Sequence, residues 1–180
     1  IYGYMQTLDA PTLIQGSKTT TFTTEKEEFI GISRELIRLM EDDIYYIISS
    51  GTTLQPFMDE LGLQNTLLGV DIIFNNKLIA SDVNENTILE FISNRKAKII
   101  VTIIGGQGYI FGRGNQQISS KVIKAIGKEN IIVASSSSKL TALSGSPLRV
   151  DTGEKDLDNY LSGYMPIITG FKQSHMCKVV

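Results

Sequence analysis

Short apolar runs alternate with helical segments along most of the chain, and this alternation constrains the fold most. From residue 44 onward, runs such as Ile44–Ser49, Lys98–Ile104 and Ile131–Ala134 are separated by glycines and by stretches with helical spacing. A continuous apolar run of this kind fits a strand that is buried on both faces, so helices must cover both sides of the sheet. We therefore expect an α/β fold with a three-layer, mostly parallel Rossmann-like sheet and an N-terminal β hairpin or arm.

The first residues have a different pattern from the rest of the chain. β-Prone residues surround an Asp-Ala-Pro turn, and a threonine-rich stretch follows them. This predicts an N-terminal arm or hairpin over residues 1–24 and a single α/β domain over residues 25–180. The Thr24-x-x-Glu27 pattern fits a capping box, so we expect a helix to begin there. Because the chain starts with Ile1, we expect it to be the C-terminal part of a longer protein.

Composition excludes several classes of function. The 180 residues include 17 basic and 19 acidic side chains, which give a formal net charge of -2 and no basic field for nucleic acid or a membrane surface. No apolar run approaches the roughly 20 residues that a membrane helix needs. One cysteine cannot form an internal disulfide and favours a reducing compartment. We expect a cytoplasmic protein without a nucleic-acid or membrane partner.

The first candidate site is the turn Ser50, Gly51, Thr52 and Thr53, which lies between a predicted strand and a predicted helix. Backbone N–H groups, hydroxyls and the positive end of a helix dipole come together at such a turn, and Gly51 allows close approach of a ligand. The turn therefore predicts phosphate or carboxylate binding. It is not a Walker loop, because no lysine follows the glycine at the required position. The alternative is that Thr52 or Thr53 only caps the helix.

The second candidate site is the glycine-rich segment, residues 105–117, directly after the predicted strand Lys98–Ile104. Its five glycines disfavour regular secondary structure and would bring backbone and polar side chains onto a ligand. The guanidinium group of Arg113 offers several hydrogen-bond donors in a geometry that suits phosphate. Tyr109 or Phe111 could stack on a base or fill the core. A purely structural loop is the alternative. The predicted ligand contacts are Gly105, Gly106, Gln107, Gly108, Gly112, Arg113, Gly114, Asn115 and Gln116.

Two further patterns leave alternatives open. Asp71 lies inside an apolar run, where it could bind Mg²⁺, a ribose or a backbone N–H pair, or make structural hydrogen bonds. The glycines 106 and 108 resemble part of a dinucleotide fingerprint, with Ser135–Lys139 where a ribose phosphate would lie. The next helix is predicted to begin only near Ser119, too far away for the standard fingerprint. With a single His and a single Cys, we assign no metal ligands.

Several segments together resemble a known family. They are YGYMQ, GTT with LGLQNTLLGVD, GGQGYIFGRGNQQIS, KENIIV, and PLRVDTG with LSGY. The chain resembles the C-terminal half of a divergent ATP-NAD kinase family, in the branch that includes the acetoin-catabolism-associated protein. The resemblance implies phosphorylation of NAD to NADP, with ATP or polyphosphate as donor, Mg²⁺ and ATP as cofactors and NAD as substrate.

One departure from that family affects catalysis. The GGDGT signature of the family carries an acidic residue, whereas Gln107 follows the glycine pair in this chain. An amide cannot act as a carboxylate base. The resemblance therefore implies that the catalytic residue belongs to a missing N-terminal half, and we expect the isolated chain to be inactive.

The sequence thus favours a nucleotide- or phosphate-binding C-terminal domain of an NAD kinase-like enzyme. We expect the 50–53 turn and the glycine-rich segment to meet at the carboxyl ends of parallel strands. The expected partners are a nucleotide or phosphorylated small molecule, the missing N-terminal half, and another copy in a homo-oligomer. The alternatives are a non-catalytic sensor that binds a sugar phosphate or nucleotide, and a structural dimerisation half.

Overall fold

The structure is a computed structural model that describes residues 22–64, 66, 68–104 and 106–180. The predicted N-terminal hairpin or arm lies almost wholly outside the described residues. The elements follow one another in the order α1 (Phe22–Leu39), β1 (Tyr45–Ile48), η1 (Thr52–Leu54), α2 (Gln55–Glu60), β2 (Asp71–Phe74), β3 (Lys77–Ala80), α3 (Glu85–Ile92), β4 (Ala97–Thr102), β5 (Tyr109–Phe111), α4 (Ser120–Ile126), η2 (Lys128–Asn130), β6 (Ile131–Ala134), α5 (Ser137–Ala142), β7 (Arg149–Val150), α6 (Lys155–Leu161), β8 (Gly163–Gly170) and β9 (Gln173–Val179).

Seven strands form the main sheet in the order β3-β2-β1-β4-β6-β8-β9. The four central strands, β1, β4, β6 and β8, run parallel to one another, and β2, β3 and β9 add antiparallel pairs at the two edges. A second sheet pairs β5 with β7, which run parallel. The mostly parallel sheet predicted from the apolar runs is confirmed.

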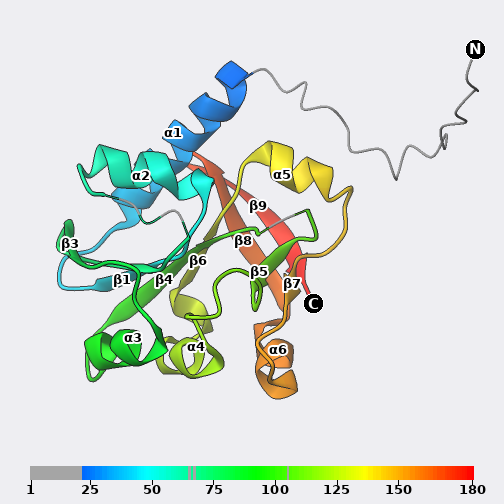
Figure 1. The fold of residues 1–180 in the computed structure, drawn as a ribbon. Coiled ribbons are helices and arrows are strands. Elements are labelled where there is room, and N and C mark those ends of the chain that lie inside the picture. The colour runs from blue at the N-terminus through cyan, green and yellow to red at the C-terminus, as the bar shows by residue number, and fades with distance from the viewer. Residues whose placement is uncertain (1–21, 65, 67, 105) are drawn as a thin grey trace, which may run out of the picture.

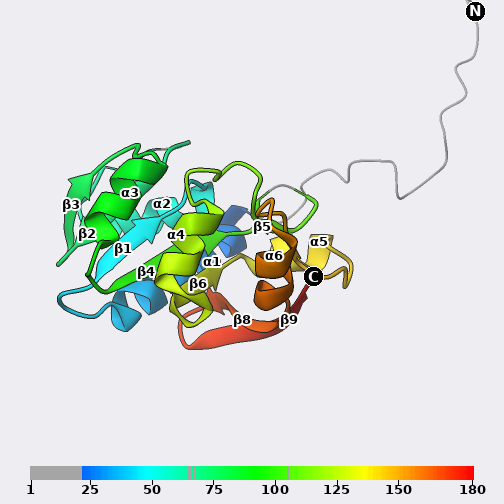
Figure 2. The same ribbon diagram turned by 90° about the horizontal axis from the view of Figure 1, so that it is seen from below.

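Helices cover both faces of the sheet, so the predicted three layers are confirmed. On one face, α1 and α2 pack through Ile32, Leu36 and Phe57 against the β1 residue Ile48. On the other face, α3, α4 and α6 pack against the β1 residue Ile47 and its neighbours. Figures 1 and 2 show these two helical layers on opposite sides of the strands. Successive strand residues point to opposite faces, which is why the buried strands read as continuous apolar runs.

Local signals in the sequence set several element ends. Asn84 caps α3, and its side-chain oxygen accepts a hydrogen bond from the Thr87 backbone N–H at 3.0 Å. Ser119 caps α4 in the same way, as its predicted position suggests. The predicted capping box at Thr24 is wrong, because α1 begins at Phe22 and Thr24 lies within the helix.

Helix α1 is 18 residues long and packs against β8 and α2. Its buried side includes Ile32 and Leu36, and Arg34 on the other side is exposed. Among the described residues, no helix combines the length and the apolar character needed to cross a membrane.

Candidate functional site

The carboxyl ends of three parallel strands meet at one edge of the sheet. In the β1–β4 pair Ile48 lies opposite Ile100, and in the β4–β6 pair Thr102 lies opposite Ala134. Because the strands run in the same direction, the segments that follow them emerge at the same edge. These segments are the 50–53 turn after β1, the glycine-rich segment after β4, and the serines that lead into α5 after β6.

The two segments singled out from the sequence touch each other at this edge. The Ser50 hydroxyl donates a hydrogen bond to the Gly114 carbonyl oxygen at 3.4 Å. The Thr102 hydroxyl, at the end of β4, donates to the Ser50 carbonyl oxygen at 3.5 Å. The structure therefore brings the 50–53 turn and the glycine-rich segment together, as we expected.

Gly51 has a backbone conformation that a side chain would not permit. Its φ is 143° and its ψ is 140°, and a Cβ atom there would lie 2.6 Å from Thr102 Oγ1. Gly51 is the N-cap of η1 and Leu54 is the N-cap of α2, and neither cap has a side-chain hydrogen bond. The alternative in which Thr52 or Thr53 caps the helix is therefore not what the structure has.

A lysine that the sequence did not assign to this turn lies beside it. Lys139, on α5, donates a hydrogen bond from Nζ to Thr53 Oγ1 at 3.0 Å. Helix α5 is fixed at its start by Ser136, whose side chain caps it, and by Glu28, which accepts a hydrogen bond from the Ser137 N–H at 3.1 Å. The sequence feature that could have indicated this contact is that the predicted strand before Lys139, now β6, ends at the same edge of the sheet as β1 and β4. The site thus gains a cation that the turn itself lacks.

The glycine-rich segment is more regular than its composition predicted. Residues 109–111 form β5, which pairs with β7. At Gly112 φ is 89°, and a Cβ atom would lie 1.7 Å from the Asp151 carbonyl oxygen. The close approach of the glycine-rich segment to the Asp151 backbone therefore requires a glycine at position 112. Glycine in this segment thus has a packing role in addition to any role in ligand binding.

Aromatic residues of this segment divide between the core and the surface. Phe111 is fully buried, so it fills the core instead of stacking on a base. Tyr109 is half-buried, and the guanidinium of Arg113 lies 4.5 Å from the centre of its ring. Arg113 also lies 4.0 Å from the Asp151 carboxylate, and both side chains are about half exposed, at 56% and 53%. Arg113 is therefore open to solvent, and the nearby Asp151 carboxylate partly offsets its positive charge.

Asn115 is buried inside the segment. Its Nδ2 donates to the Ile110 carbonyl oxygen at 2.9 Å, and its Oδ1 is buried with no hydrogen-bond partner among the described residues. A buried acceptor without a donor is costly, so this oxygen is a position where a donor would be stabilising. The following residue, Gln116, is exposed.

Two hollows open along the glycine-rich segment. One, of about 270 Å³, is lined by Gly112, Gln116, Ile118, Ser119, Ser120, Asp151, Thr152 and Gly153. The other, of about 520 Å³, is lined by Gly106, Gln107, Tyr109, Ala142, Leu143, Ser144, Ser146 and Arg149. Gly108 does not line the second hollow but packs against Leu143, which does: a Cβ atom on Gly108 would lie 3.2 Å from that side chain. Residues 50–53 line neither hollow. Gly105 lies outside the described residues.

Asp71 makes structural hydrogen bonds. It is buried at the start of β2, and its carboxylate accepts from the Thr66 N–H at 2.8 Å, from the Thr66 hydroxyl at 2.6 Å and from the Asp82 N–H at 3.0 Å. These three donors satisfy a carboxylate that would otherwise be costly to bury. Binding of Mg²⁺ or ribose by Asp71 stays a prediction.

A magnesium cage would need several metal-binding side chains close together. Among the described residues, no group of three or more His, Cys, Asp or Glu side chains lies close enough together to hold a metal ion. The side chains in the described part of the chain therefore do not fit a dedicated Mg²⁺ cage. In nucleotide sites Mg²⁺ is commonly held by substrate phosphates and water with one or two carboxylates.

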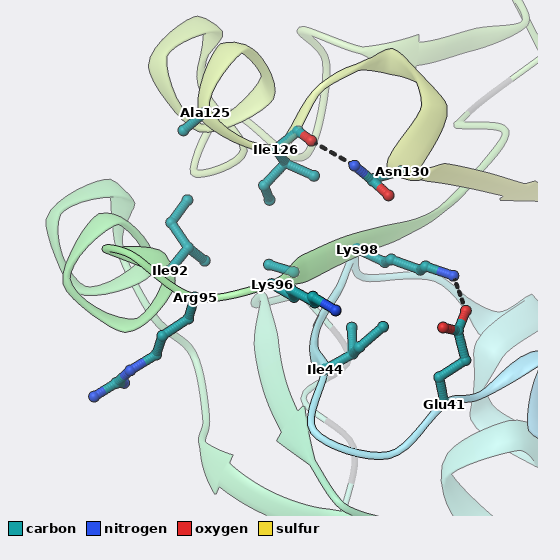
Figure 3. A pocket seen from close by; sticks show the side chains of 10 residues that line it. Glu41, Ile44, Ile92, Arg95, Lys96, Lys98, Ala125, Ile126 and Asn130 are labelled. Carbon is teal, nitrogen blue, oxygen red and sulfur yellow. Dashed lines mark hydrogen bonds and ion pairs between the residues drawn. The ribbon is translucent and has the colours of Figure 1, made fainter.

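Another hollow, of about 470 Å³, lies at the amino ends of β1 and β4 (Figure 3). Two of its three basic residues, Arg95 and Lys98, have structural partners. Lys98 pairs with Glu41 (Figure 3), and Arg95 donates to the Phe91 carbonyl oxygen at 3.2 Å. The side chain of Asn130 donates to the Ile126 carbonyl oxygen at 2.8 Å. The ends of α3 and α4 present negative dipole ends here, which attract cations and disfavour anions. This hollow is not the candidate site.

Comparison with known proteins gives one match. A family model described as the ATP-NAD kinase C-terminal domain matches residues 41–179. No curated protein matches the chain, and no solved structure does. The matched range begins after α1 and includes every strand of the described residues, β1 to β9, together with both contacting segments.

Proposed function

The chain belongs to the ATP-NAD kinase C-terminal domain family, and we propose that it supplies nucleotide- or phosphate-binding loops to an NAD kinase-like enzyme. The proposed reaction is phosphorylation of NAD to NADP with ATP or polyphosphate as donor. The resemblance noted in the sequence supports placement in the acetoin-catabolism-associated branch. The single cysteine supports a reducing compartment such as the cytoplasm.

The observation that carries this proposal is the contact between Ser50 and Gly114 at the carboxyl edge of the sheet. Ligands of open α/β sheets bind at this edge. The Gly51 and Thr52 backbone N–H groups and the neighbouring hydroxyls would donate to phosphate oxygens. Lys139, held beside Thr53, would add a positive charge that a phosphate needs.

The proposal assigns the catalytic acid or base to another part of the enzyme. Gln107 is exposed and carries an amide, which cannot abstract the proton of an attacking hydroxyl. The chain would therefore bind and orient the phosphates, and an N-terminal half would be its partner. Mg²⁺ would enter with the phosphates of ATP, because the described residues do not form a cage for it. Homo-oligomer formation is part of the same proposal.

The test is calorimetric titration of the chain with ATP, NAD and ribose 5-phosphate. Gly51→Ala places a Cβ atom against Thr102 and should weaken binding of ATP and NAD at least about tenfold. Gly62→Ala is the matched control, because Gly62 also has a positive φ, of 69°, but a Cβ atom there meets nothing within 4 Å. Binding of ribose 5-phosphate alone would contradict the kinase assignment and favour a sensor domain.

A further inference from the structure

Two side chains that could bind a ligand lie next to each other in the lining of the 520 Å³ hollow. Tyr109 on β5 and Arg149 on β7 are direct partners in the parallel pair, and both line the hollow. Paired residues of neighbouring strands point to the same face of a sheet. An aromatic ring and a guanidinium therefore border the same space, although 40 positions separate them in the chain.

The walls of this hollow are held by backbone hydrogen bonds. The Arg149 N–H donates to the Gly108 carbonyl oxygen at 2.9 Å, and the Ile104 N–H donates to the Tyr109 carbonyl oxygen at 2.7 Å. Between two other lining residues, the Ser146 N–H donates to the Leu143 carbonyl oxygen at 2.8 Å. A ligand would thus meet a largely preformed site, which lowers the entropic cost of binding.

The lining has the chemistry of a nucleotide site. Arg149 is the one charged residue among the eight that line the hollow, and no carboxylate is among them. Gln107, Ser144 and Ser146 add neutral groups that both donate and accept hydrogen bonds. Tyr109 offers a flat π surface, and Arg113 already lies against its ring at 4.5 Å. The hollow's volume is within the range of small-molecule sites, roughly 300–1,000 Å³.

We propose that this hollow binds a nucleoside phosphate, with the base stacked on Tyr109 and a phosphate oxygen bound by Arg149. The stacked base exploits the aromatic ring, and the guanidinium fork matches the phosphate. This inference rests on the proposed nucleotide-binding function, but it uses residues other than the 50–53 turn. The base would bind at the part of the glycine-rich segment around Tyr109, whereas the Ser50 contact involves Gly114, near the other end of that segment.

The experiment is calorimetric titration of the full chain with AMP, adenosine and inorganic phosphate. Tyr109→Leu keeps bulk but removes the π surface, so AMP and adenosine should both bind about tenfold more weakly or worse, while phosphate is unchanged. Its control is Tyr160→Leu on α6, where the tyrosine is 53% exposed and also lies near a lysine. That control should leave AMP binding unchanged.

Arg149→Gln tests the phosphate half of the proposal, and because Arg149 is exposed this variant remains informative if Tyr109→Leu fails to fold. It should weaken AMP binding about tenfold and leave adenosine binding unchanged. Arg34→Gln, at an exposed arginine of α1, is the control for the lost charge. Tight AMP binding in both Tyr109→Leu and Arg149→Gln would overturn the inference. If Gly51→Ala still weakened ATP binding in that case, the proposed function would stand.

Discussion

Lys139 Nζ lies 3.0 Å from Thr53 Oγ1, so a cation that follows β6 reaches the turn that follows β1. The two residues are 86 positions apart, and β4 lies between their strands in the sheet. The contact therefore connects the segments that follow β1 and β6, across the end of β4, at the carboxyl edge of the sheet. It places a positive charge beside the turn to which the proposed function assigns a phosphate.

Lys139→Met should weaken ATP binding about tenfold, because it keeps the aliphatic stem and removes the charge. The loss should be larger at low salt than at high salt, since ions screen the attraction. Calorimetry at two ionic strengths measures both effects. Lys155→Met, at an exposed position of α6, is the control. Equal affinity in the wild type and Lys139→Met would remove Lys139 from the site.

Gly112→Ala should destabilise the fold by about 2 kcal/mol or more, since it combines a positive φ with a clash against the Asp151 backbone. Gly145→Ala shares the positive φ, 79° against 89°, but its Cβ atom meets nothing within 4 Å. It should cost only about 1–2 kcal/mol. Urea unfolding measures both free energies. Equal losses would show that β5 and the Asp151 segment do not approach as closely as described.

Asn115→Asp should lower the free energy of unfolding at pH 7 by about 3 kcal/mol or more, because it buries a charge beside the Ile110 carbonyl. Burial raises the pKa of such a carboxyl group, so the loss should shrink as the pH falls and the neutral acid donates to Ile110. Gln116→Glu, on the exposed neighbour, should change little. Urea unfolding at pH 7 and at about pH 5 tests this; a loss that does not depend on pH would contradict it.

Glu35 should make the fold sensitive to acid. Hydrogen bonds from the Arg38 guanidinium, at 2.7 and 2.9 Å, hold the pKa of the Glu35 carboxyl below its ordinary value of 4.5. A folded-state pKa below the unfolded value gives stability that is present above pH 4.5 and is lost as the pH falls through the folded pKa. Glu35→Gln should remove this part of the acid dependence in urea unfolding. Glu90→Gln, at an exposed position of α3, should keep it.

Much of the central sheet was predictable because buried parallel strands are continuous apolar runs. The predicted strand Ile131–Ala134 matches β6, and Lys98–Ile104 overlaps β4. The strand β5 was not predicted, because its glycine-flanked residues form a strand only through pairing with β7. That partner lies far along the chain, and a local pattern carries no information about it.

The site was predictable where it depended on chain topology. Two polar segments that each follow a parallel strand had to emerge at one edge, which placed Ser50 near Gly114. The contact of Lys139 with Thr53 depends on how α5 is held against Glu28, and the sequence gives no sign of that. The hydrogen bonds of Asp71 likewise depend on Thr66 and Asp82, which fold back around it.

The most direct test of the account is nuclear magnetic resonance of the ¹⁵N-labelled chain during titration with ATP. The account predicts that the amide signals of Gly51 and Gly114 move together and give one dissociation constant, because both segments contact one ligand. The signal of Gly62, remote from the edge, should stay in place. Movement of the Gly114 signal without that of Gly51, or of neither, would contradict the claim that the two segments form one phosphate-binding site.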